Sequence, residues 1–298
     1  MNFWKRLFKR RGRSRRVLVI EGGGMRGVFL TGVLQAFTDH AYFPFDLIIG
    51  TSAGALTGCA YAARQIHLAR SAFFGKLSSG DFIHVSNIFH SERHILDLDW
   101  MIDAIIRGPE PLDIAALKKA CPVIITAANC PDDQAPETIY LNSKKDDIFE
   151  SLKATAAIPF LYRGFVQYKG YKLLDGGVTD PIPFYKALEM GYKDKDILIL
   201  TTRPRGYRKK PDSFGVRALY ERYYKEPELD RLVESMKNLY KKYNAILDNL
   251  ENVHKDIEVI YPPADFSVER LTTEPKKLLG GFEQGVSAGN ETVEFIDF

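Results

Sequence analysis

The segment 47–63 constrains this chain more than any other, because it joins a strand, a sharp turn and a helix. Leu47, Ile48 and Ile49 form the apolar run of a buried strand, and the small residues at 55–63 are typical of a tightly packed helix. Between them the sequence GTSAG, residues 50–54, matches the G-x-S-x-G pattern of a nucleophile elbow. Such a turn exposes a serine hydroxyl at a helix N-terminus, where developing negative charge is favoured. Ser52 is therefore a candidate nucleophile, although a serine in this position also caps ordinary helices.

A similar unit precedes this one. Val17–Ile20 reads as a short buried strand, residues 22–27 (GGGMRG) form a glycine-rich loop, and residues 28–37 continue as a helix. The strand that begins at Leu47 follows after a short loop. The order strand, helix, strand predicts a parallel sheet.

The glycine-rich loop also fits G-x-G-x-x-G, the fingerprint of dinucleotide-binding folds. That function requires an acidic residue at the end of the second strand, where it holds the ribose. Here Asp46 stands at the start of that strand, and its end is taken up by Ser52. Nucleotide binding is therefore disfavoured. The alternative is an oxyanion hole, because consecutive glycines leave backbone N–H groups bare and able to approach a reacting carbonyl.

The remaining chain alternates strands and helices. Residues 64–120 are mostly helical in pattern, with an irregular stretch at 81–94. We expect strands at 123–128, 138–141, 197–200 and 257–261, a hairpin at 165–174, helices at 146–157, 183–190 and 227–252, a basic loop at 203–210, and a helical C-terminal stretch.

A serine nucleophile needs a base, and histidine is the usual one. In the chain order of α/β-hydrolases only His254 qualifies, but it lies in a polar loop and reads as a surface residue. Asp175 is the better candidate because it ends a strand, and Gly176 and Gly177 leave room beside it. In isolation the same three residues would read as an Asp-Gly turn.

Together these stretches resemble the patatin-like phospholipase family. The family pattern is G-G-G-x-[RK]-G, then G-x-S-x-G, then D-G-[GA], and it corresponds here to residues 22–27, 50–54 and 175–177. Residues 154–160 also resemble the family's small-residue helix that ends in proline. The resemblance covers roughly residues 17–200 and implies an α/β fold in three layers, with a mostly parallel central sheet and helices on both faces.

The resemblance also implies roles for individual residues. Ser52 would be the nucleophile and Asp175 the base of a Ser–Asp dyad. The oxyanion hole would comprise Gly22, Gly23, Gly24, Met25, Arg26 and Gly27, with Gly23 and Gly24 as the favoured N–H donors. Gly50, Thr51, Ala53 and Gly54 would form the nucleophile elbow, and Gly176 and Gly177 the loop beside the base.

The function implied is that of a serine lipid acyl hydrolase, a phospholipase A or esterase that cleaves carboxylic esters through an acyl-enzyme. Two alternatives remain: a soluble carboxylesterase or thioesterase with the same dyad, and a non-catalytic protein that binds lipid. We expect no cofactor and no metal, since no cluster of ligating residues is evident. The three cysteines form no C-x-x-C pair, which favours a reducing compartment.

The charge is divided unevenly along the chain. Residues 1–16 carry eight basic residues and no acid, which leaves 33 basic and 38 acidic residues in the other part. Phe3, Trp4, Leu7 and Phe8 share one helical face of this basic head, a pattern typical of helices that lie on anionic membranes. A disordered basic tail or a nucleic-acid arm is the alternative, but an arm would not need the aromatic face.

These features predict the organisation and location of the protein. We expect a basic amphipathic head at 1–16, a patatin-like catalytic domain at 17–200, and a mainly helical part at 201–298 packed on the same domain. The head lacks the apolar core of a signal peptide, and no run of eighteen apolar residues exists to span a membrane. The expected location is cytoplasmic and peripheral on the inner face of the membrane. The expected partners are a phospholipid or other acyl-ester substrate and an anionic membrane surface, and no nucleic acid.

Overall fold

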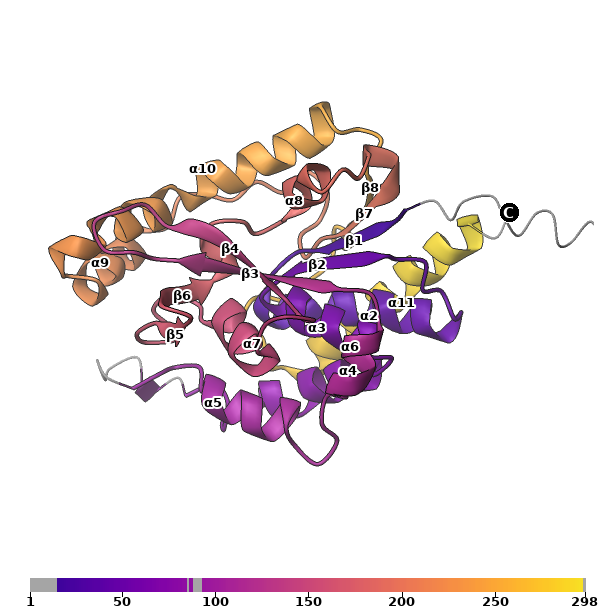
Figure 1. Ribbon diagram of the computed structural model, residues 1–298, viewed down its shortest axis with the longest axis horizontal. Coiled ribbons are helices and arrows are strands. Elements are labelled where there is room, and N and C mark those ends of the chain that lie inside the picture. The colour runs from indigo at the N-terminus through magenta and orange to yellow at the C-terminus, as the bar shows by residue number, and fades with distance from the viewer. Residues whose placement is uncertain (1–14, 85, 88–92, 297–298) are drawn as a thin grey trace, which may run out of the picture.

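A computed structural model describes residues 15–84, 86–87 and 93–296 of the chain. Its centre is an 8-stranded sheet in the order β5-β6-β3-β2-β1-β7-β8, with β4 paired to β3 on the side (Figure 1). The strands around β1 are parallel, whereas β4, β5 and β6 form antiparallel pairs. The strands are β1 (Val17–Ile20), β2 (Leu47–Thr51), β3 (Val123–Asn129), β4 (Glu137–Asn142), β5 (Val166–Tyr168), β6 (Tyr171–Asp175), β7 (Ile197–Leu200) and β8 (Glu258–Ile260).

Helices cover both faces of this sheet, as Figure 1 shows. On one face lie α2 (Gly27–Asp39), α3 (Ala53–Ala62), α4 (Ile66–Phe74), α5 (Leu98–Met101), α6 (Ile114–Lys119), α7 (Ile148–Ala156) and α11 (Pro275–Ile296). On the other lie α8 (Phe184–Glu189) and α10 (Asp230–Asn252), with α9 (Phe214–Tyr223) beside the start of α10. The predicted three-layer α/β fold is therefore confirmed.

The period of the buried strands explains the three layers. Successive side chains of a strand point to opposite faces of the sheet. Leu18 and Ile20 belong to the apolar cluster on the α2 side, and Val17 and Val19 belong to the cluster with α8 and α10. All four are fully buried. A continuous apolar run is what a strand covered on both faces requires.

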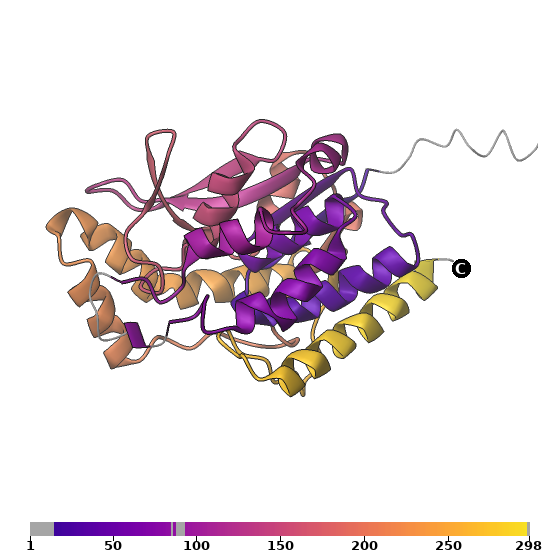
Figure 2. The same ribbon diagram turned by 90° about the horizontal axis from the view of Figure 1, so that it is seen from below.

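The last helix packs against the first one described. Figure 2 shows α11 running along α2, although the two lie at opposite ends of the chain. Glycines allow this close approach, because a Cβ on Gly32 would lie 2.2 Å from the carbonyl oxygen of Phe282. A Cβ on Gly285 would meet the carbonyl of Phe29 at the same distance. The segment after residue 200 thus contributes β8 to the sheet and α11 to one helical layer.

Strand β3 brings two other strands end to end. The parallel strand β2 ends at Thr51 opposite Thr126, and the antiparallel strand β6 ends at Asp175 opposite Ala127. Because β4 occupies one edge of β3 along this stretch, β2 and β6 share the other edge. The carboxyl ends of β2 and β6 therefore face each other, and Ser52 follows one of them directly.

Most predicted elements occur within a few residues of the expected bounds. The hairpin of β5 and β6 turns at Lys169 and Gly170, whose φ angles of 52° and 82° suit a type I′ turn. Helix α9 was not predicted, because its sequence lacks an apolar stripe and none of its residues is buried.

Residues 1–14 of the basic head lie outside the described residues. No helix in the described part of the chain is long and apolar enough to cross a membrane.

Candidate active site

Ser52 occupies a strained turn between β2 and α3. Its φ of 54° and ψ of −127° lie outside the regions that non-glycine residues ordinarily adopt. The backbone N–H of Ser52 donates a 2.8 Å hydrogen bond to Oγ1 of Thr155, and that hydroxyl donates to the carbonyl of Thr126 at 2.6 Å. Helix α7 and strand β3 thus hold the turn, which lies in the interior with Ser52 only 6% exposed.

The glycines of the elbow are needed because the chain crosses itself closely there. A Cβ on Gly50 would lie 2.7 Å from Cα of Ala55, and one on Gly54 would lie 2.5 Å from the carbonyl oxygen of Glu21. Both distances are far below ordinary contact, so any side chain would force the backbone apart. The G-x-S-x-G spacing therefore reflects the packing of β2 against α3, and of α3 against the end of β1.

Asp175 lies at the end of β6, directly beside the serine. Its Oδ1 accepts a hydrogen bond from the N–H of Gly177 at 2.7 Å, and Asp175 and Ser52 line the same polar cavity. Burial raises the pKa of Asp175 to about 6, while the neighbouring Ser52 hydroxyl, the Gly177 N–H and the charge of Arg270 act in the opposite direction. A carboxylate with this pKa is ionised at neutral pH, and it is a stronger base than an exposed aspartate.

The glycine loop presents two bare N–H groups. The N–H of Gly22 is bonded to the carbonyl of Pro181, that of Met25 to the carbonyl of Arg270, and that of Arg26 to the carbonyl of Gly23. Gly27 caps the short helical turn at 24–26, and its N–H bonds within it. Among the described residues, the N–H groups of Gly23 and Gly24 have no partner. These two are the groups able to bind an oxyanion.

The loop also lies directly against the nucleophile. A Cβ on Gly22 would be 3.1 Å from Cβ of Ser52, and Gly24 has a φ of +56°, which glycine adopts without strain. Arg26 is buried behind the loop, and its Nε has no hydrogen-bond partner among the described residues. Its guanidinium Nη1 lies 4.0 Å from Oε2 of Glu269.

A buried carboxylate that the sequence did not single out supports the loop. Glu21 is 2% exposed, and its two oxygens accept hydrogen bonds from the N–H of Thr202 at 2.5 Å and from the hydroxyl of Tyr243 at 2.7 Å. Burial raises the pKa of Glu21, and the hydrogen bond from Tyr243 opposes that shift. The sequence did contain a sign of this buried carboxylate, because Glu21 directly follows the apolar strand β1 and precedes the glycines.

Two cavities meet at Ser52. One, of about 80 Å³, is narrow and lined almost entirely by apolar side chains, including Leu56, Phe73 and Leu77. The other, of about 540 Å³, is polar and is lined by the glycine loop, Asp175 and several basic side chains. An ester placed at the serine could therefore extend an acyl chain to one side and a polar group to the other.

Two other residues considered from the sequence are His254, which lies away from Ser52, and Gly176, which lies beside the base. His254 lines neither of these two cavities, and its Nδ1 is 3.1 Å from Oδ2 of Asp194. Gly176 packs under the base, since a Cβ there would be 2.4 Å from the carbonyl of Thr126. The described residues contain no group of three or more His, Cys, Asp or Glu side chains able to hold a metal ion.

Two family models match parts of this chain. The family model described as patatin-like phospholipase matches residues 18–188, which include both Ser52 and Asp175. The chain belongs to the patatin-like phospholipase family. A second model, described as a domain of unknown function (DUF6363), matches residues 229–297.

Individual relatives extend over most of the chain. The uncharacterized protein YjjU of Escherichia coli (strain K12) is 32% identical over 254 residues, which are 84% of this chain and 69% of that protein. Lysophospholipase NTE1 of Debaryomyces hansenii is 27% identical over 83% of this chain, and the match spans 16% of that much longer protein. The crystal structure of VipD from Legionella pneumophila shares the fold, with a TM-score of 0.51 and 13% identity over 94% of this chain and 67% of that one.

Proposed function

We propose that this protein is a serine lipid acyl hydrolase, which cleaves carboxylic esters of phospholipids through an acyl-enzyme. The observation that carries the proposal is that Ser52 and Asp175 lie side by side at the meeting ends of β2 and β6, where an apolar and a polar cavity join. Family membership and the name of a relative, a lysophospholipase, support a lipid substrate.

The first half of the proposed reaction forms the acyl-enzyme. Asp175 takes the proton of the Ser52 hydroxyl as Oγ attacks the ester carbonyl. The N–H groups of Gly23 and Gly24 bind the negative oxygen of the tetrahedral intermediate. When the intermediate collapses, the carbon–oxygen bond to the alcohol breaks, and the protonated Asp175 returns its proton to that alcohol.

The second half releases the fatty acid. Asp175, again ionised, takes a proton from water, and the hydroxyl oxygen attacks the acyl carbonyl on Ser52. When the second intermediate collapses, the bond from the acyl carbon to Ser52 Oγ breaks, Asp175 returns its proton to Oγ, and the fatty acid is released. Both halves need one base that is ionised at neutral pH, which a carboxyl with a pKa of about 6 provides.

The narrow apolar cavity favours a lipid acyl chain over a polar acyl group. A soluble carboxylesterase or thioesterase would use the same dyad, and a non-catalytic lipid-binding protein would use the same cavities. The unpaired N–H groups beside Ser52 argue for catalysis, because an idle pocket has no need of preorganised donors.

A panel of acyl esters tests the proposal. Short nitrophenyl esters, thioesters and phospholipid vesicles would be incubated with the wild-type protein and with Ser52→Ala. We expect turnover of oxygen esters, increasing with acyl length up to the capacity of the apolar cavity, and its loss in Ser52→Ala. Turnover that persists in a folded Ser52→Ala variant would exclude the serine as nucleophile.

We also propose that the basic head attaches the enzyme to anionic membranes. The support is the sequence of residues 1–16, whose eight basic residues accompany Phe3, Trp4, Leu7 and Phe8. Each basic residue contributes about 1 kcal/mol near an anionic leaflet, and this attraction weakens as salt increases. Deletion of residues 2–16 should sharply reduce co-sedimentation with anionic vesicles and leave hydrolysis of a soluble ester unchanged. Equal co-sedimentation of both forms would exclude the head as the anchor.

A further inference from the structure

The polar cavity beside Ser52 contains cations that lack partners. Arg26 and Arg203 share the carboxylate of Glu269, whose Oε2 lies 4.0 Å and 3.6 Å from their guanidinium nitrogens. In contrast, the Lys209 ammonium and the Arg270 guanidinium have no hydrogen bond or ion pair among the described residues, although both line the cavity. These two positive charges, together with that of the exposed Lys210 on the same cavity wall, are therefore available to a ligand.

Arg270 lies where the two cavities join. It lines both of them, and its backbone carbonyl accepts the N–H of Met25, which fixes it over the glycine loop. A Cβ on Gly24 would lie 2.9 Å from Cγ of Arg270. The side chain is therefore adjacent to the N–H groups that face the reacting carbonyl, and its charge contributes to the pKa of Asp175.

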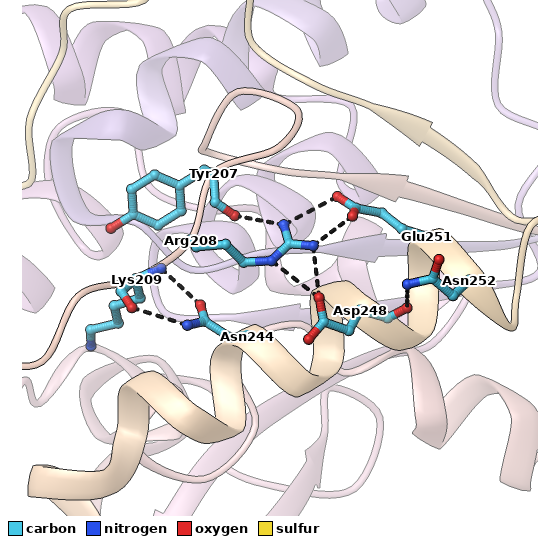
Figure 3. A network of polar contacts seen from close by, with 7 residues as sticks. All are labelled: Tyr207, Arg208, Lys209, Asn244, Asp248, Glu251 and Asn252. Atoms are coloured by element: carbon cyan, nitrogen blue, oxygen red, sulfur yellow. Dashed lines mark hydrogen bonds and ion pairs between the residues drawn. The ribbon is translucent and has the colours of Figure 1, made fainter.

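Lys209 is fixed by helix α10, as Figure 3 shows. Asn244 accepts the backbone N–H of Lys209 at 2.7 Å and donates to its carbonyl at 3.0 Å. The neighbouring Arg208 forms ion pairs with Asp248 at 2.7 Å and Glu251 at 2.6 Å. These contacts neutralise Arg208 and anchor the loop, so that Lys209 remains in the cavity wall without being paired.

The cavity concentrates positive charge in a poorly solvated place. Burial, reinforced by Arg270 and Arg203, lowers the pKa of Arg26 to about 10. Burial, reinforced by Arg270, lowers the pKa of Lys209 to about 8, although the charge of Asp212 opposes this shift. The Asp212 carboxylate accepts a hydrogen bond from the Tyr220 hydroxyl at 3.0 Å. An anion in the cavity would relieve this repulsion.

We propose that Lys209 and Arg270 bind the phosphate of a phospholipid head group, so that the enzyme selects anionic glycerophospholipids. This inference rests on the proposed lipid acyl hydrolase function. In a glycerophospholipid a few glycerol atoms separate the phosphate from an acyl ester. An ester at Ser52 with its chain in the apolar cavity therefore leaves the phosphate in the polar one. A head group with its own cation, such as choline, would meet the basic side chains unfavourably.

Binding to the Ser52→Ala protein tests this without turnover. The probes are dihexanoyl phosphatidic acid and dihexanoylglycerol, which differ by the phosphate, and calorimetry measures their dissociation constants. We expect the phosphatidic acid to bind more tightly, and Lys209→Gln and Arg270→Gln each to reduce this preference about tenfold, the value of one charge-assisted hydrogen bond. Equal binding of the two lipids would overturn the proposal.

Arg205→Gln is the matched control. It removes the same charge from the same loop, but Arg205 is exposed and lies over the ring of Tyr261, outside the residues that line the cavity. The lipid preference should be unchanged in this variant, and an equal loss would indicate general surface attraction instead. Inorganic phosphate should bind far more weakly than the phosphatidic acid. If it bound as tightly, the site would serve free phosphate and the head-group assignment would be wrong.

Hydrolysis by the wild-type protein separates this inference from the proposed function. Turnover of both lipids at equal kcat/KM would overturn head-group selection and leave the hydrolase function in place. Absence of turnover, together with selective binding of phosphatidic acid that is lost in Lys209→Gln and Arg270→Gln, would overturn the hydrolase and support the phosphate site.

Discussion

The two halves of the candidate site are held by different parts of the chain. The Ser52–Asp175 pair is fixed by β2, β3, β6 and α7, all of which lie within residues 18–188, the part that matches the family model. The glycine loop and Glu21 before it belong to the same part, but several of their contacts come from later residues: Thr202, Tyr243 and Arg270. Two of these, Tyr243 and Arg270, lie in the segment matched by the domain of unknown function.

This difference indicates what the later segment contributes. Ser52 and Asp175 stand at the ends of β2 and β6, and the pairing of both strands with β3 fixes their positions. The glycine loop has few internal hydrogen bonds, so the direction of its N–H groups depends on neighbours. Residues after 200 therefore act as a structural part of the candidate oxyanion site. Substitution of Ser52 or Asp175 should therefore abolish most activity, whereas substitutions after residue 200 should reduce it only partly.

The largest effect is expected for Asp175→Asn. The amide keeps the shape but cannot take the proton of Ser52, so kcat should fall by up to about 10⁴-fold, the upper end of what a positioned general base contributes. Asp180→Asn is the matched control, since Asp180 is also buried with a pKa of about 6 but bonds Tyr140 and lines neither cavity at Ser52. Steady-state kinetics on a nitrophenyl ester measures both variants, and similar losses would argue against a special role for Asp175.

Substitution in the glycine loop should have the next largest effect. A Cβ on Gly23 would lie 2.8 Å from the Thr202 side chain, so Gly23→Ala should displace the loop and its N–H groups. Loss of one oxyanion donor lowers kcat by about 10²–10³-fold. Gly280→Ala is the control, because a Cβ on Gly280 in α11 would meet no atom within 4 Å and its backbone is not left-handed. An effect on KM with kcat unchanged would indicate that the loop binds substrate without stabilising the oxyanion.

The sequence predicted the elements that carry Ser52 and Asp175 better than the contacts around the glycine loop. The apolar runs of β1, β2, β3 and β7 and the glycine spacing around Ser52 are local patterns, and local patterns can be read directly. That Ser52 and Asp175 meet depends on β6 joining the same edge of β3 as β2, which involves residues far apart in sequence. The family resemblance supplied this pairing, and the residues alone did not.

The side-chain contacts that hold the Ser52 turn and the glycine loop could not be predicted from the sequence. Thr155, Thr202 and Tyr243 are ordinary polar residues in their local sequence, and their partners lie more than one hundred positions away. The basic loop at 203–210 was visible as a run of charge, but its division into the paired Arg208 and the unpaired Lys209 depends on α10. Long-range side-chain pairing leaves no periodic signal in a single sequence.

The pH dependence of catalysis tests the dyad side independently of mutation. Asp175 acts as a base in its ionised form, and burial raises its pKa to about 6. Activity should therefore be constant above this pH, and kcat/KM should fall about tenfold per pH unit below it. The measurement is a pH profile on a soluble ester with no titratable group. Activity that falls to half only near pH 4 would mean that the base has an ordinary aspartate pKa, contrary to its burial.

The smallest effect is expected for Tyr243→Phe, which tests the later segment alone. The substitution removes one of the two hydrogen bonds that Glu21 receives, and a buried carboxylate that loses a donor destabilises the fold by about 1–3 kcal/mol. Because Glu21 precedes the glycine loop, kcat should also fall by a few-fold, with KM nearly unchanged.

Thermal unfolding and kinetics together measure these two effects. The control is Tyr192→Phe, since Tyr192 is also buried but its hydroxyl has no hydrogen bond within the described residues. If Tyr243→Phe lost stability but kept its full kcat, the residues after 200 would stabilise the fold without contributing to catalysis. In that case the glycine loop would hold its own geometry, and the contrast between the two halves of the site would not extend to function.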